Sequence, residues 1–249
     1  MSKSNSRQTR SPACTASVIL IVSACFLVGA TGLAGPPGKF ERTYTPQGSA
    51  HLTIANVNGL IRVAAWEKKT VCVRADSAPS VSIEDRTVGD DITISVKRNF
   101  RLGRADFEVS LPAESSLSLR NVIGNIEVQG ITGHISVNSI DSDIRLLRVN
   151  SSSIDVKVTS GDIYFDGELR EGGSYSLQSM KGDLDVTLPG STPFNLNARA
   201  LSENINLGGF LSSLTGASRG TKGVSGSYLK GGSRLTLTTY DGRILLHKK

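Results

Sequence analysis

The sequence predicts an all-β protein, a β-solenoid in which short strands stack with about twenty residues in each coil. Two observations predict this fold. Apolar and polar residues alternate with period two along segments such as "DITISVKR" and "RLTLTT", as expected of strands with one buried face. In addition, an isoleucine or leucine recurs in the same phase nine times along the chain. One coil is too small to bury its own apolar face, so we expect the coils to stack.

The repeats share three positions. Their apolar anchors are Ile61, Ile126, Ile135, Ile144, Ile154, Ile163, Leu184, Ile205 and Ile244. A second apolar residue follows two positions later, and the residue between points outward. Two positions before the anchor, six repeats have a glycine: Gly59, Gly124, Gly133, Gly161, Gly182 and Gly242. Glycine there predicts a structural corner, because it supplies a positive φ or a close backbone approach. Ser142, Ser152 and Glu203 replace it at the other three corners.

Residues 1–35 have the layout of a secretory signal peptide. Three cations precede an apolar run, and the segment contains no acid. The run is also long enough to remain as an N-terminal membrane anchor. A third alternative is a lipoprotein, because "VSAC" would place a lipid on Cys25. All three alternatives predict an exported protein of the periplasm or the cell surface, with membrane contact only through this segment.

Residues 36–249 are expected to form a single domain with four parts in chain order. They are less regular opening strands that cap the stack (36–115), regular repeats (116–207), a Gly/Ser-rich surface loop or irregular coil (208–233) and closing strands (234–249). The spacing of the anchors predicts that each coil lies above the previous one, with an insertion before the last. A β-sandwich of short antiparallel strands is the rival architecture. Nine repeats in one phase favour the solenoid.

Three stretches resemble a bacterial family of adhesin-like β-strand-repeat domains, long classed as a domain of unknown function. They are "HLTIANVNGLIRVAAWEKKTVCVRA" (51–75), "FEVSLPAESSLSLRNVIGNIEVQGITGHISVNS" (107–139) and "GGSRLTLTTYDGRILL" (231–246). The resemblance extends over nearly everything after about residue 40. It implies an exported, repetitive β-solenoid with no established enzymatic activity.

The corner residue just before the anchor is an aspartate in three repeats, Asp143, Asp162 and Asp183. Such a column could hold calcium, as in β-rolls, but those turns have three glycines where this chain has one. Aspartate also favours turns because it bonds nearby backbone groups. The turn interpretation is preferred, and the sequence predicts no metal, no cofactor and no catalytic residue. The outward residues of successive strands have mixed charges and show no pair of carboxylates suited to glycoside hydrolysis.

The charge of the chain does not indicate a nucleic-acid-binding protein. Removing the three cations of residues 1–35 from the total of 28 leaves 25 against 22 acids, a net charge of +3. Nucleic-acid binding needs a clustered basic face. The leading hypothesis is therefore an exported, non-catalytic adhesin or cell-envelope scaffold whose partner, a protein or a glycan, is unknown. A carbohydrate-active or carbohydrate-binding β-helix is the alternative, and a polymerising scaffold similar to the bactofilins is a further one.

Overall fold

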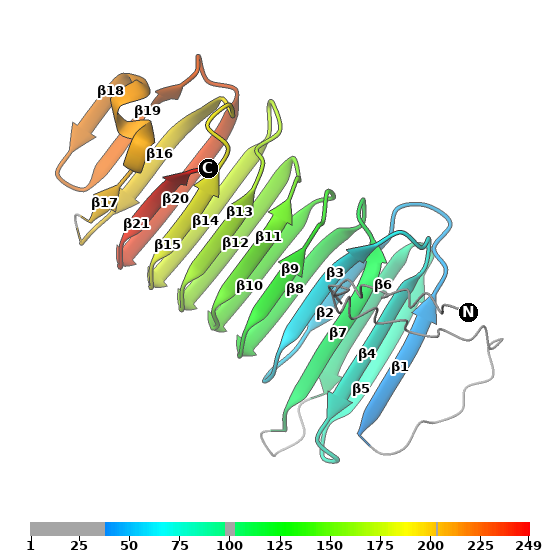
Figure 1. Cartoon of the computed structure of the whole chain (residues 1–249). Helices are drawn as coiled ribbons and strands as arrows, with labels where there is room; N and C mark the ends of the chain where they lie inside the picture. The colour runs from blue at the N-terminus through cyan, green and yellow to red at the C-terminus, as the bar shows by residue number, and fades with distance from the viewer. Residues whose placement is uncertain (1–37, 98–102, 203) are drawn as a thin grey trace, which may run out of the picture. The chain divides into compact units, whose positions relative to one another are not determined.

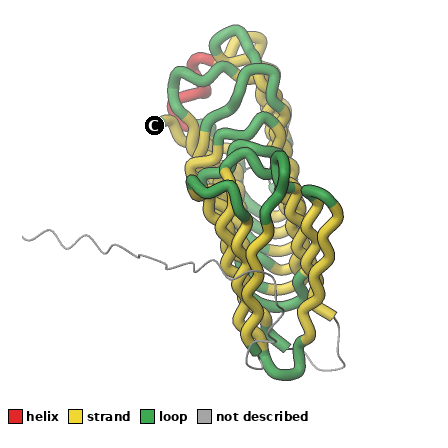
Figure 2. The backbone as a smooth tube through the Cα atoms, turned by 90° about the vertical axis from the view of Figure 1, so that its right-hand side faces the viewer, coloured by secondary structure: helices red, strands yellow, loops and turns green. Residues whose placement is uncertain are grey.

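A computed structural model describes residues 38–97, 103–202 and 204–249. The predicted signal or anchor segment, with Cys25, lies outside the described residues, and so does Glu203. The described residues belong to one compact unit, Gly35–Lys249. In this unit two β-sheets face each other across an apolar core (Figures 1 and 2). The predicted all-β solenoid is confirmed.

Between residues 91 and 206, successive described strands alternate between the two sheets. Sheet A has, in spatial order, β1 (Lys39–Tyr44), β4 (Val71–Ser77), β7 (Ala105–Pro112), β3 (Ile61–Trp66), β9 (Ile126–Gln129), β11 (Ile144–Val149), β13 (Ile163–Gly167), β15 (Leu184–Leu188), β21 (Ile244–Lys248) and β17 (Ile205–Asn206). Sheet B has β18 (Leu214–Gly220), β19 (Gly223–Tyr228), β16 (Phe194–Ala200), β20 (Ser233–Asp241), β14 (Ser174–Lys181), β12 (Ser153–Ser160), β10 (Ile135–Asp141), β8 (Ser116–Ile123), β2 (His51–Ala55), β6 (Asp91–Lys97) and β5 (Ser82–Val88).

One strand from each sheet makes a coil, and the coils stack in register. In sheet A the anchor Ile144 pairs with Ile126 on one side and Ile163 on the other. In sheet B, Ile135 pairs in the same way with Leu117 and Ile154. All six side chains are buried. The period-two alternation therefore forms two facing ladders of aliphatic side chains, whose burial drives the stacking.

The order of the coils in space differs from the expected order at both ends. From β8 to β15 each coil follows the previous one, as predicted (Figure 1). The last coil, β20–β21, instead lies between β14–β15 and β16–β17, so Leu235 pairs with both Tyr175 and Leu196. At the other end, β2–β3 lies between β6–β7 and β8–β9. Spacing along the chain could not reveal this, because an inserted coil repeats the same pattern wherever it is placed.

The Gly/Ser-rich segment 208–233 is not a long loop. It contains a 3₁₀ helix, η1 (Gly208–Ser213), and the antiparallel hairpin β18–β19, which extends sheet B. Phe210 of η1 packs edge-on against Phe194 and Tyr228, at ring-centroid distances of 5.4 and 4.9 Å. The aromatic cluster closes this end of the core. The hairpin lacks the alternating pattern because β18 is exposed along nearly its whole length.

The opening strands close the other end of the stack with antiparallel pairs. β1 pairs with β4, β4 with β7, and β5 with β6. The turn between β5 and β6 passes through Gly89 at φ +60°. β4 and β5 run against the parallel ladder and so do not continue the repeat, whereas β6 and β7 pair parallel with β2 and β3.

Candidate binding surface on the outer face of sheet A

The six glycines that were predicted to form corners lie at two kinds of corner. Gly59, Gly124, Gly161, Gly182 and Gly242 begin the turn into sheet A, and Gly133 begins a turn into sheet B. At Gly161 φ is +132°, and a Cβ there would lie 2.1 Å from the carbonyl oxygen of Ser142 in the neighbouring coil. The other five would also place a Cβ between 2.0 and 2.3 Å from a backbone carbonyl oxygen. Glycine is required because backbones stack almost in contact at these corners.

The serines that replace glycine lie in different surroundings. Ser142 is buried at a sheet A corner, and its hydroxyl contacts that of Ser139. Ser152 is exposed at a sheet B corner.

The corner aspartates link successive coils rather than hold their own turns. A carboxylate oxygen of Asp143 accepts a hydrogen bond of 3.0 Å from the backbone N–H of Asp162. Asp162 accepts one of 2.7 Å from the N–H of Asp183, and Asp183 accepts one of 2.8 Å from the N–H of Arg243. This aspartate ladder explains why aspartate recurs just before the anchor. From the sequence, each aspartate was expected to bond backbone groups of its own turn, but the observed bonds go to the next coil.

A second, buried ladder was missed by the sequence analysis. The side chains of Asn121, Ser179 and Thr239 donate hydrogen bonds of 2.9–3.0 Å to the corner carbonyls of Gly59, Gly161 and Gly182. They satisfy acceptors that the crowded corners would otherwise bury without partners. The signal was present, because each donor stands three residues before a corner glycine. Strict alternation of apolar and polar residues leads one to expect apolar residues at inward positions, so an inward polar residue is taken as a break in the strand pattern.

The outer face of sheet A presents a central column formed by the residues between anchor and follower. In spatial order it reads Glu108, Arg62, Glu127, Arg145, Tyr164, Asp185 and Leu245, each in register with the next. Arg62 forms ion pairs with the two glutamates beside it, at 3.5 and 3.7 Å. The column thus changes from paired charges to a tyrosine and a leucine along the stack.

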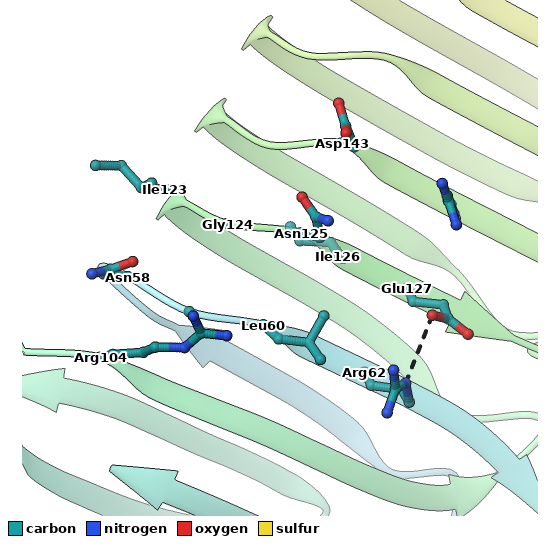
Figure 3. Close-up of a pocket in the computed structure, with 12 residues that line it drawn as sticks. Asn58, Leu60, Arg62, Arg104, Ile123, Gly124, Asn125, Ile126, Glu127 and Asp143 are labelled. Atoms are coloured by element: carbon teal, nitrogen blue, oxygen red, sulfur yellow. Dashed lines mark ion pairs between the residues drawn. The ribbon is translucent and has the colours of Figure 1, made fainter. Parts of the chain in front are cut away.

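Two shallow hollows lie along this column and the aspartate ladder. The first has a volume of about 560 Å³, and Figure 3 shows Arg62 and Glu127 in it beside Asn125 and Asp143. The second has a volume of about 500 Å³, and it surrounds Tyr164 with Leu147, Leu245 and the ladder carboxylates. Asp143 and Arg145 line both hollows, so the two hollows adjoin on the outer face of sheet A. We call this feature the sheet A groove.

Arg243 sets the electrostatics at one end of the groove. Its guanidinium nitrogens Nη2 and Nε lie 2.6 and 3.0 Å from Oδ2 of Asp183. The hydrogen bonds from Arg243 hold the pKa of Asp183 below its ordinary value, and Asp183 raises the pKa of Arg243. A general acid for glycoside hydrolysis needs a raised pKa. Asp183 is therefore suited to an ionised, structural role.

Among residues 38–97, 103–202 and 204–249, no three His, Cys, Asp or Glu side chains gather closely enough to hold a metal ion. Within the same described ranges, no helix has the length and apolar character needed to cross a membrane.

Comparisons with known proteins place the repeat in a family. The family model described as Toastrack DUF4097 matches residues 44–247. No sequence among the curated proteins matches the chain. The fold is similar to the crystal structure of a "putative cell adhesion protein" from Clostridium sporogenes, with 12% identity and a TM-score of 0.44 over 86% of this chain and 100% of that chain. It is also similar to a "putative adhesin" from Bacteroides fragilis, with 11% identity and a TM-score of 0.39 over 88% of this chain and 100% of that chain.

Proposed function

The chain belongs to the Toastrack DUF4097 family, and we propose that it is an exported, non-catalytic binding protein of the cell envelope or cell surface. It holds a surface partner, a glycan or a protein, along the sheet A groove. The observation that carries this proposal is the groove itself, whose two adjoining hollows are open, extend over several coils and are lined by both charged and apolar side chains.

Tyr164 is the residue of the groove best suited to grip a ligand. It is half-buried, stands outward on β13 and is flanked in register by Arg145 and Asp185. An aromatic ring beside charged groups can pack on the apolar face of a sugar or a side chain, while its neighbours bond polar groups. Neighbouring coils are about 4.8 Å apart, so the groove suits an extended ligand that runs along the stack.

The carboxylates of the groove support binding rather than catalysis. Asp143, Asp162 and Asp183 each accept a backbone hydrogen bond from the next coil. Hydrolysis of a glycoside needs one carboxyl group that keeps its proton and a second that remains free. Carboxylates committed to holding coils together are poorly placed for either task.

Export rests on the cationic and apolar pattern of residues 1–35. The proposal commits to a cleaved signal peptide, with Gly32 and Ala34 offering small residues before Pro36. Amino-terminal sequencing of the protein recovered from the envelope should find a mature terminus near Pro36. An intact Met1, or a blocked terminus at Cys25, would identify a retained anchor or a lipoprotein instead.

Binding is tested with the exported protein on glycan arrays and on immobilised envelope proteins. Three forms are compared: the wild type, Tyr164→Ala and a matched control, Asp155→Ala. Asp155 is the outward residue of the same coil on sheet B. We expect Tyr164→Ala to lower affinity for the bound partner at least tenfold and Asp155→Ala to leave it unchanged. Loss of binding in Asp155→Ala alone would place the surface on sheet B, and no binding by the wild type would contradict the proposal.

A further inference from the structure

A stripe of exposed and half-buried apolar side chains follows the corner where the chain leaves sheet B. Its residues come immediately after the buried positions Ser139, Ser179 and Thr239, so they stand in one column. In spatial order the column reads Val57, Val122, Ile140, Thr159, Met180, Tyr240 and Leu201. Ile140, Met180 and Tyr240 are 53, 52 and 51% exposed. We call this column the apolar stripe.

A contiguous apolar surface on a soluble body points to an interaction site. The stripe spans about 29 Å, because seven coils are separated by six steps of ~4.8 Å. A single surface-exposed aliphatic residue would need no explanation. Six apolar residues in seven consecutive coils do need one.

The order of residues along the stripe is symmetric about Thr159. One coil away on either side lie Ile140 and Met180, and two coils away lie Val122 and Tyr240. If a second copy were turned end to end about an axis across Thr159, every apolar residue would face an apolar residue. The spacing would match along the whole stripe, because both copies have the same coil repeat.

Two charged residues beside the stripe fit the same symmetry, whereas Asp241, in register with Lys181, would face the partner's Ile123. The next column toward sheet A places Asp141 and Lys181 one coil on either side of Ser160. Both side chains are exposed. In the end-to-end arrangement, Asp141 faces the partner's Lys181 and Lys181 faces the partner's Asp141. An in-register parallel arrangement would not make these two charge pairs.

We propose that the apolar stripe is a self-association surface on which two copies of this chain pair antiparallel about a two-fold axis through Thr159. Such an interface is isologous, since the same patch serves both copies. One stripe and its flanking columns bury less than the roughly 800 Å² per partner of a standard interface. The dimer is therefore expected to be weak, with a dissociation constant in the micromolar range or above. The proposal does not depend on the function of the sheet A groove.

Cysteine cross-linking of the full chain tests the arrangement, in a background with Cys14 and Cys25 replaced by serine. Thr159→Cys lies on the axis and should oxidise to a disulfide-linked dimer. Ile140→Cys alone should not, because its two copies lie about 10 Å apart along the stack, beyond disulfide reach. A mixture of Ile140→Cys and Met180→Cys should give the mixed dimer. Val88→Cys is the matched control, because Val88 is 59% exposed but lies away from the stripe.

Sedimentation of the charge variants gives the second test. Asp141→Lys and Lys181→Asp should each weaken association about tenfold, and the double reversal should restore it. Cross-linking of Ile140→Cys with itself would overturn the antiparallel arrangement. Absence of any Thr159→Cys dimer would overturn the proposal. A different result would be that the protein pellets with anionic phospholipid vesicles, loses this binding in Met180→Asp and forms no dimer. That result would assign the stripe to a membrane and would also overturn the proposal.

Discussion

The carboxylate of Asp143 accepts a hydrogen bond of 3.0 Å from the backbone N–H of Asp162, one coil away. The same bond recurs from Asp162 to Asp183 and from Asp183 to Arg243. A turn residue thus joins neighbouring coils, and the outer edge of the solenoid is tied by side chains in addition to the backbone ladder.

Replacement of Asp162 by alanine should destabilise the fold by about 1 kcal/mol, the net contribution of one such hydrogen bond. Asp162→Asn should cost less, because its amide oxygen can accept the same bond. The free energy of unfolding from urea titration at pH 7 measures both effects. Asp241→Ala, at an exposed position on the other side of the corner, is the control. Equal effects of Asp162→Ala and the control would contradict a stabilising ladder.

Gly161→Ala should destabilise the protein by about 2 to 4 kcal/mol, since it combines an unfavourable φ with a clash against a backbone oxygen. Gly172→Ala is the matched comparison, because Gly172 also has a positive φ, +71°, but has open space around it. It should cost only about 1 kcal/mol. Thermal and urea unfolding of the two variants separate crowding from backbone conformation. A cost at Gly161 no larger than at Gly172 would show that the corners are not close-packed.

The Asp183–Arg243 pair should make stability depend on acid pH. The hydrogen bonds from Arg243 lower the pKa of Asp183 in the folded protein. The pair therefore stabilises the fold fully above the unfolded pKa of about 3.9, and this contribution is lost as pH falls through the lower, folded pKa. Urea midpoints measured between pH 7 and pH 2 should fall more steeply in the wild type than in Arg243→Gln. Parallel curves for the two proteins would contradict the linkage.

Val158→Thr should stabilise the protein by about 0.5 to 1 kcal/mol, a typical net gain for a hydrogen bond. Val158 is in register with Ser139 and Ser179, but its side chain cannot donate a hydrogen bond. Threonine has nearly the same shape, and its hydroxyl would take the position from which Ser179 and Thr239 donate to corner carbonyls. Urea unfolding of Val158→Thr and of Thr239→Val should therefore shift in opposite directions. A destabilised Val158→Thr would indicate that no acceptor is within reach.

The regular part of the fold could be predicted from the sequence because its physical cause is local. An anchor such as Ile144 and its corner are set by neighbouring residues and repeat in one phase. The placement of β20–β21 between earlier coils depends on contacts between distant residues, such as Leu235 with Leu196. The closing cluster around Phe210 likewise joins segments with no shared pattern.

The candidate surface was predictable only in part. The outward position of Tyr164 follows from alternation along one strand. The extent of the groove and the pairing of Arg243 with Asp183 depend on which coils are neighbours, and Arg243 and Asp183 are 60 positions apart in the chain. The inserted last coil brings them together.

Whether the sheet A groove binds a partner without converting it is measured most directly by incubating the exported protein with the glycan or protein it captures. Bound and unbound material is then analysed by mass spectrometry and, for a glycan, by release of reducing ends. The expected result is an unchanged ligand whose retention is lost in Tyr164→Ala and kept in Asp155→Ala. Product that accumulates with the wild type and disappears when Asp143, Asp162 and Asp183 are all replaced by alanine would contradict a non-catalytic binding protein.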